Sequence, residues 1–351
     1  MKNYNPSVGY LKALGILLMV LGHSGNTLHI NHFIYMFHMP LFFFVSGYCF
    51  KEKYLSAPRQ YIYNKVKGIY WPYVKWSLLF LLLHNVCFNL HLYSDQYGWK
   101  EYVSHLYAPS EFLNLATSII FKMHGHEQLL GGYWFMNALF FGSLIVWLVI
   151  RYVKQPLCGG AILIVICTVL NKTCWQIPFI NISSQAFAAG LLIYIGYSLA
   201  KYRIKPFKYW QIALSLSITL IGSFVWNMAM DQNSYSNKRF IPYIITAVLA
   251  SWSFYSLFDK MKSSHGICAK ALDFIGKNTL TILTWHFLAF KLVSLVIIGI
   301  YDLPIERLAE FPVITEYSKQ GWWIAYFFVA ITTCCGLIYC NGWIKSNWLK
   351  L

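Results

Sequence analysis

Charged side chains are scarce in this chain of 351 residues. They make up 11% of the sequence, whereas hydrophobic residue types make up 58%. A typical soluble globular domain carries about 25% charged residues, so the composition argues against an ordinary cytosolic enzyme. It also argues against a disordered protein, because disorder requires low hydrophobicity together with high net charge.

Acidic residues are the rarer charged class, with 12 Asp and Glu against 28 Lys and Arg, which gives a formal net charge of +16. Such an excess of positive charge can indicate a nucleic-acid-binding protein. The alternative is a membrane protein whose basic residues flank its apolar segments on the cytoplasmic side. The aromatic content of 19% favours the alternative, because Trp and Tyr are enriched at membrane interfaces.

No Cys-x-x-Cys pair occurs among the nine cysteines, so neither a zinc ribbon nor a dithiol redox motif is supported. Most of the cysteines lie in apolar stretches, where cysteine packs as a small hydrophobic residue, and we predict no metal site. A signal peptide is also not indicated. The first apolar run leads into Gly22-His23-Ser24 without a small-x-small cleavage site, which favours a retained membrane span.

Long apolar runs fill most of the chain. A helix needs about 20 mostly apolar residues to cross a bilayer, and ten segments meet or approach this length. They are 9–26, 33–50, 70–92, 132–152, 157–171, 180–200, 210–229, 240–258, 279–300 and 321–341. The connections are too short for a separate soluble domain, so we predict one all-α, polytopic membrane domain over residues 1–351. Stretch 112–121 is too short to span and is expected to be re-entrant or interfacial.

The distribution of Lys and Arg predicts the orientation of these spans. Ten spans place both termini on the same side. With the N-terminus in the cytoplasm, eighteen basic residues fall in inner segments and seven in outer segments. This asymmetry follows the positive-inside rule, so we predict cytoplasmic N- and C-termini. Topology then accounts for the positive charge, and we predict no nucleic-acid partner.

Ionisable residues inside a membrane span are costly and mark candidate functional sites. Lys12 and His23 both lie in the first span, eleven residues apart. Eleven residues make about three helical turns, so the two side chains share one face and are separated by roughly 16 Å along the axis. The alternatives are a snorkelling interfacial lysine for Lys12 and a histidine at an outer helix end for His23.

Two further histidines inside predicted spans are candidate functional residues. His38 is in the outer half of the second span, where Pro40 is expected to kink the helix and free a backbone carbonyl. His38 and His23 lie at similar depth on adjacent helices and can face one another. His286 falls near the middle of the ninth span, where a helix–helix hydrogen bond is the alternative to a catalytic role. No span contains Asp or Glu, so an acidic partner must come from a loop, and Glu127 is the best placed.

Four sequence elements, in order, resemble those of the integral membrane acyltransferase type 3 family. They are Tyr10 to His23, with a basic residue, ten residues and then His; Phe37 to Tyr48; Tyr133 to Leu139; and Gly276 to His286. The combination of Lys12 with Gly15 and Gly22 is most similar to the fucose 4-O-acetylase-like branch.

Two positions depart from the family pattern. Gly9 stands where many members carry Asp. In the second inner loop, Lys65 matches the first Arg of an Arg-x-x-Arg pair and Gly68 replaces the second, with Lys67 as a candidate substitute. Lysine lacks the bidentate fork with which arginine holds phosphate groups.

The resemblance implies a multi-pass enzyme of the bacterial cytoplasmic membrane. Such an enzyme transfers an acyl group, here expected to be acetyl, from cytoplasmic acyl-CoA to a hydroxyl of a cell-surface or exported glycan. The expected partners are acyl-CoA, a glycan or lipid-linked sugar acceptor, and the lipid bilayer. Acetyl-CoA is then a co-substrate, and no permanently bound cofactor is expected. A transporter or flippase for a glycan or lipid-linked precursor is the alternative function.

On this scheme each candidate residue has a stated role. His23 is the expected base and His38 orients it or binds the acceptor. The residues expected at the acyl-CoA end are Lys12, Lys65 and Lys67. Residues that are candidates for acceptor binding or support are Glu127, Trp134, Asn137, His286 and Ser46.

Overall fold

The computed structural model describes residues 5–99, 102–153, 155–173, 176–177, 180–226, 240–263 and 266–347. Within these ranges the protein is almost wholly helical, which confirms the all-α class. The β-structure described is one antiparallel pair of two-residue strands, β1 (Gln176–Ile177) and β2 (Ile182–Ser183).

The helices follow one another along the chain with short connections. The α-helices are α1 (Pro6–His23), α2 (Leu28–Tyr35), α3 (His38–Tyr48), α4 (Lys53–Ser56), α5 (Pro58–Lys65), α6 (Trp71–Leu82), α7 (His84–Asn89), α8 (Pro109–Lys122), α9 (Trp134–Tyr152), α10 (Pro156–Thr173), α11 (Ser184–Lys201), α12 (Tyr209–Trp226), α13 (Phe240–Met261), α14 (Ile267–Lys277), α15 (Thr279–Tyr301), α16 (Thr315–Tyr317) and α17 (Trp323–Asn347). Short 3-10 or π segments are η1 (Val66–Tyr70), η2 (Gln128–Tyr133), η3 (Ile305–Ala309) and η4 (Ser318–Trp322).

Several helices are suited to a bilayer. Among the described residues, five segments are long and apolar enough to cross a membrane; they are Pro6–His23, Gln128–Tyr152, Phe240–Met261, Thr279–Tyr301 and Thr315–Gly342. The protein is therefore a multi-pass membrane protein, and the count of ten spans stays a prediction. Residues 227–229 of the seventh predicted span and both chain ends, 1–4 and 348–351, lie outside the described residues.

The second predicted span is two helices rather than one. α2 ends at Tyr35, and α3 begins at His38 after a break at Met36 and Phe37. Pro40 lies in the first turn of α3, where its missing N–H removes no helical hydrogen bond. The kink that the sequence predicts at Pro40 therefore lies at Met36 and Phe37, before Pro40. The eleven residues of α3 extend only about 16 Å, roughly half the hydrocarbon thickness.

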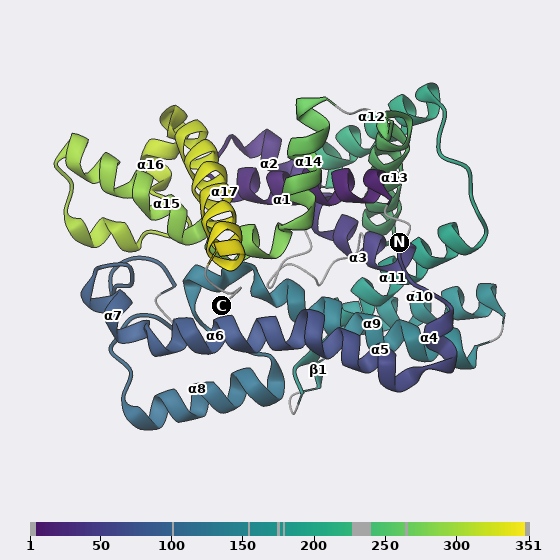
Figure 1. Cartoon of the computed structure of the whole chain (residues 1–351), viewed down its shortest axis with the longest axis horizontal. Coiled ribbons are helices and arrows are strands. Elements are labelled where there is room, and N and C mark those ends of the chain that lie inside the picture. The colour runs from purple at the N-terminus through teal and green to yellow at the C-terminus, as the bar shows by residue number, and fades with distance from the viewer. Residues whose placement is uncertain are drawn as a thin grey trace.

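The third predicted span is also interrupted. α6 ends at Leu82 and α7 begins at His84. The short apolar stretch 112–121 lies within α8, which runs beside α6 (Figure 1).

α1 lies at the centre of the helix packing. It contacts α3, α13, α14, α15 and α17, and Figure 1 shows it between α17 on one side and α13 on the other. α3 in turn packs closely on α11. At that crossing a Cβ atom on Gly47 would clash with the backbone carbonyl of Ile193, and one on Gly196 would clash with that of Phe44. This close contact fixes α3, which carries His38, against the rest of the bundle.

Candidate active site

Two histidines far apart in the sequence form a hydrogen-bonded pair. His23 is the last residue of α1 and His286 lies in α15. The His23 Nδ1 and His286 Nε2 atoms are 3.1 Å apart, and the two rings are stacked with their centroids 5.4 Å apart. The structure thus places His286, a supporting candidate, in direct contact with the expected base.

The backbone around His286 determines which nitrogen of the pair carries a hydrogen atom. His286 Nδ1 lies 3.1 Å from the carbonyl oxygen of Ile282 and 3.0 Å from that of Leu283. A carbonyl oxygen only accepts, so Nδ1 must donate. In a neutral His286 ring Nε2 is then an acceptor, and His23 Nδ1 donates to it. The remaining nitrogen, His23 Nε2, keeps its lone pair and can act as a base.

His38 belongs to the same cluster. Its Nδ1 donates to the carbonyl oxygen of Ile34, 2.9 Å away, at the break between α2 and α3. His38 lies close enough to His23 for charges on the two rings to repel each other. Tyr35 connects the two histidines, because its ring packs against His38 and its hydroxyl donates to the carbonyl of Gly22 at 3.0 Å.

The three histidine side chains differ in how far they are exposed. His38 is 4% exposed and His286 is fully buried, whereas His23 is partly exposed. In the described part of the chain no carboxylate is hydrogen-bonded to any of the three. An unpaired imidazolium is costly in such surroundings, which favours neutral rings with His23 as the reachable base.

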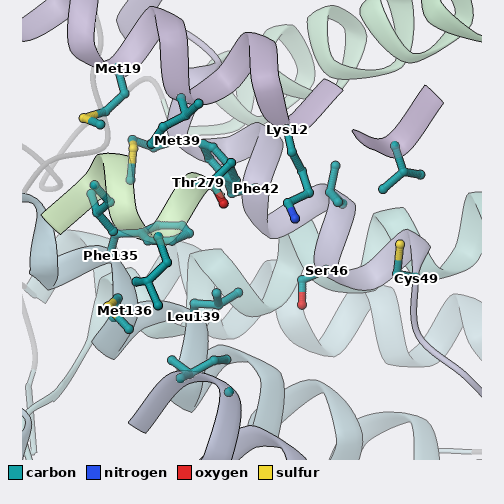
Figure 2. A pocket seen from close by; sticks show the side chains of 17 residues that line it. Lys12, Met19, Met39, Phe42, Ser46, Cys49, Phe135, Met136, Leu139 and Thr279 are labelled. Atoms are coloured by element: carbon teal, nitrogen blue, oxygen red, sulfur yellow. The ribbon is translucent and has the colours of Figure 1, made fainter. Parts of the chain in front are cut away.

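A cavity of about 410 Å³ lies between α1, α3, α9 and α15 (Figure 2), within the usual size range of small-molecule sites. Its described lining consists of Val8, Lys12, Ile16, Met19, Met39, Phe42, Val45, Ser46, Cys49, Gly68, Ile69, Phe135, Met136, Leu139, Thr279, Leu280 and Leu283. Figure 2 shows Lys12, Ser46 and Cys49 at one end, and Met19 and Met39 at the other. The cavity thus has a cationic, polar end and an apolar end.

Lys65 lies directly behind the polar end. Its Nζ atom donates to Ser143 Oγ at 3.0 Å and to Ser46 Oγ at 3.4 Å, and it lies over the Tyr61 ring. Burial lowers the pKa of Lys65 to about 8. Lys12, in the cavity lining, and Lys65, bonded to Ser46 behind it, therefore contribute two amino groups at this end of the cavity.

A family model described as an acyltransferase domain matches residues 5–341. The chain belongs to this acyltransferase family. The match includes every helix that lines the cavity or carries one of the three histidines. Neither a curated protein nor a solved structure gives a significant match.

One predicted donor-binding residue of the acyltransferase, Lys67, lies outside the described cavity lining, whereas the neighbouring position Gly68 lies in it. Lys67 is exposed, with its amino group 5.9 Å from the centre of the Tyr63 ring, and it is not among the described lining residues. Gly68 does line the cavity, and a Cβ atom there would meet nothing within 4 Å. The structure thus leaves space at the position where the family pattern has its second arginine.

Three supporting candidates of the acyltransferase have contacts elsewhere. Glu127 is buried and pairs with His84, with its Oε1 atom 3.1 Å from His84 Nδ1. The side-chain amide of Asn137 lies 3.4 Å from the carbonyl of Met123, at the C-terminal end of α8. Trp134 is partly buried and packs against the hydrophobic core. None of these contacts connects the three residues to His23.

Sequence reasoning missed His84 of the acyltransferase. A usable signal existed, because His84 is an ionisable residue inside the predicted span 70–92. The signal could not have named Glu127 as its partner, since 43 residues separate the two positions.

Proposed function

We propose that this membrane acyltransferase moves an acyl group from cytoplasmic acyl-CoA to a hydroxyl of a cell-surface or exported glycan in a bacterial cytoplasmic membrane. Acetyl is the acyl group of first choice, following the resemblance to the fucose 4-O-acetylase-like branch. The observation that carries the proposal is the hydrogen bond from His23 Nδ1 to His286 Nε2. It leaves His23 Nε2 without a partner among the described residues, one helical turn from Met19 of the cavity lining.

The cavity suits an acyl-CoA with its phosphates at the cytoplasmic end. Lys12 lines that end, and in the described residues no carboxylate pairs with it. Lys65 lies behind Ser46 at the same end. Amino groups bind phosphate as point charges, and the apolar walls beyond them can hold the arm that leads to the thioester.

The histidine pair supplies the proton transfers of acyl transfer. His23 Nε2 takes the proton of the acceptor hydroxyl as the hydroxyl oxygen attacks the thioester carbon. The tetrahedral intermediate then collapses, the carbon–sulfur bond breaks, and the proton passes from His23 to the thiolate of CoA. His286 holds the imidazole ring in one tautomer throughout and accepts the hydrogen bond that strengthens as His23 becomes charged.

Hydrogen bonds that are already made at this site limit which side chains can stabilise the oxyanion. Tyr133 and Thr284 hydroxyl oxygens are 2.7 Å apart, and Thr284 donates to the carbonyl of Leu280. Tyr133 must therefore donate to Thr284, and Asn137 donates to backbone carbonyls. Ser46 accepts from Lys65 and keeps a hydrogen atom to donate, but it lies at the cationic end of the cavity, where it suits the phosphates of acyl-CoA rather than the oxyanion.

The test uses the purified acyltransferase in lipid nanodiscs, with acetyl-CoA and surface glycan from a strain that lacks the gene. Release of the CoA thiol and acetyl content of the glycan are measured together. We expect His23→Ala to lower turnover by about 10²–10⁴-fold, the usual contribution of a general base. His29→Ala, on the exposed surface of α2, is the matched control and should retain full turnover.

Two results would contradict the proposal. Turnover by His23→Ala equal to that of the wild type would overturn the assignment of the base. Glycan export that fails without the gene, with no acetyl-CoA consumed by the purified protein, would favour the transporter or flippase instead.

A further inference from the structure

Three of the apolar side chains that line the cavity come from helix positions close to the three histidines. Met19 lies four residues before His23 on α1, and Leu283 lies three residues before His286 on α15. Both positions are therefore about one helical turn from a histidine, on the same face of the helix. Met39 adjoins His38 on α3 and also lines the cavity. We call Met19, Met39 and Leu283 the apolar layer.

The apolar layer lies between the cavity and the base. The three histidines are not among the described lining residues, whereas all members of the layer are. A thioester carbon that approaches His23 from the cationic end must therefore pass this layer. The acyl group leads that carbon, so it must cross between the two methionines and Leu283 before the carbon reaches His23. Methionine side chains are flexible and can move to admit it.

Charge is distributed unevenly around this path. Among the described lining residues Lys12 is the only charged side chain, and its Cα atom lies seven residues, about 10 Å, from that of Met19 along α1. Lys291, also on α15, is not in the lining and donates instead to the carbonyl oxygen of Glu310. A carboxylate placed in the apolar layer would therefore have no cation beside it.

We infer that the acyl site selects an uncharged acyl group and rejects the half-thioester of a dicarboxylic acid. This inference rests on the proposed function. Moving an unpaired carboxylate from water into an apolar site costs several kcal/mol, whereas an alkyl group of the same length gains from the transfer. Acetyl-CoA and propionyl-CoA are accepted, and succinyl-CoA is excluded by its charge rather than by its length.

The test compares acyl-CoA donors with the wild-type protein in nanodiscs, using the same glycan acceptor. The donors are acetyl-CoA, propionyl-CoA, succinyl-CoA and the methyl ester of succinyl-CoA, which removes the charge and keeps the chain. We expect kcat/KM for succinyl-CoA to be at least 100-fold below that for acetyl-CoA. The methyl ester should recover at least tenfold of that loss.

A variant places a cation in the apolar layer. Met39→Lys preserves an unbranched side chain and should raise kcat/KM for succinyl-CoA relative to acetyl-CoA by at least tenfold, whereas Met39→Leu should leave the ratio unchanged. Met19→Lys provides the same test on α1 if Met39→Lys does not fold.

The outcomes separate the inference from the proposed function. Comparable use of succinyl-CoA and acetyl-CoA by the wild type would overturn the inference and leave the proposed function standing. So would equally poor use of succinyl-CoA and its methyl ester, because size would then be the cause. Failure to use any acyl-CoA would instead contradict the proposed function itself.

Discussion

Two side-chain pairs in this protein, His23–His286 and His84–Glu127, differ at the Nε2 atom of their first histidine. In the pair His23–His286, His286 donates to the backbone of α15 and accepts from His23 Nδ1, and His23 Nε2 has no hydrogen-bond partner among the described residues. In the pair His84–Glu127, His84 Nδ1 contacts the carboxylate and Nε2 lies 3.0 Å from the carbonyl oxygen of His105. The Tyr107 ring also covers His84, with the two ring centroids 3.4 Å apart.

On the proposed mechanism, a carboxylate partner does not by itself mark a catalytic histidine. His84 has the acidic partner that His23 lacks, yet both of its nitrogens are used. We propose a structural role for His84, since it connects α7 to the segment before η2. Gln128, which follows Glu127, extends this connection. Its side chain accepts from the Trp99 N–H and donates to the carbonyl of Leu92.

The largest effect that separates the two pairs should be on stability. Glu127→Ala removes the partner of His84 and leaves a buried polar ring that lacks its hydrogen bond. We expect the free energy of unfolding to fall by about 3–5 kcal/mol, as for other broken buried ion pairs, measured by thermal unfolding in detergent. His23→Ala should cost much less. Equal destabilisation by the two substitutions would remove the distinction between a structural and a catalytic pair.

A smaller effect should follow from changing the acceptor atom of the first pair. His286→Phe removes the acceptor for His23 Nδ1 and should lower kcat by about 10–100-fold, as loss of a supporting hydrogen bond does around metal-bound histidines. The KM for acetyl-CoA should not change. His286→Gln retains an acceptor and a donor, and it should recover most of kcat.

The pH dependence of kcat gives the control for His286. If His286 only fills space, His286→Phe should leave both kcat and its pH profile unaltered, and that result would contradict a positioning role. A rise in the KM for acetyl-CoA, with kcat unchanged, would place His286 in donor binding instead.

The smallest expected effect concerns the cationic end of the cavity. Burial lowers the pKa of Lys65 to about 8, so its charge is present below pH 8 and is lost as the pH rises through that value. We expect the KM for acetyl-CoA to rise about two- to fivefold between pH 7 and pH 9, which corresponds to one ion pair worth up to about 1 kcal/mol.

Two variants test the source of this pH effect. Lys65→Arg remains charged throughout and should abolish the rise in KM. Cys49, whose charge would interact with that of Lys65, is a second titratable group to control, and Cys49→Ser should leave the rise in place. Persistence of the rise in Lys65→Arg would assign it to another group.

Periodicity predicted the parts of the site that lie on a single helix. The eleven-residue spacing of Lys12 and His23 placed both on one face of the first span, and α1 is indeed one continuous helix. Lys12 lines the cavity, and His23 lies one helical turn after Met19, which also lines it. Continuous apolar runs likewise predicted α9, α13 and α15 with small errors at their ends.

Contacts between distant segments were beyond the reach of the same reasoning. The His23–His286 bond joins residues 263 positions apart, and no spacing rule relates them. Pro40 signalled a kink in the second span. It did not signal a full break at Met36 and Phe37, where the carbonyl of Ile34 accepts from the Phe37 N–H and from His38. The sequence shows that the Asn137 side chain can form hydrogen bonds, which made it a candidate for acceptor binding or support. The sequence does not show that this side chain bonds to the end of α8.

The short length of α3 has a consequence for how the protein enters the membrane during synthesis. Eleven residues are fewer than an independent spanning helix requires, so α3 is not expected to insert and stay in place on its own. Its close contact with α11 depends on Gly196, which is synthesised about 150 residues later. His38 should therefore reach its final position only after the sixth predicted span has been made, which makes the completion of the site a late event in biogenesis.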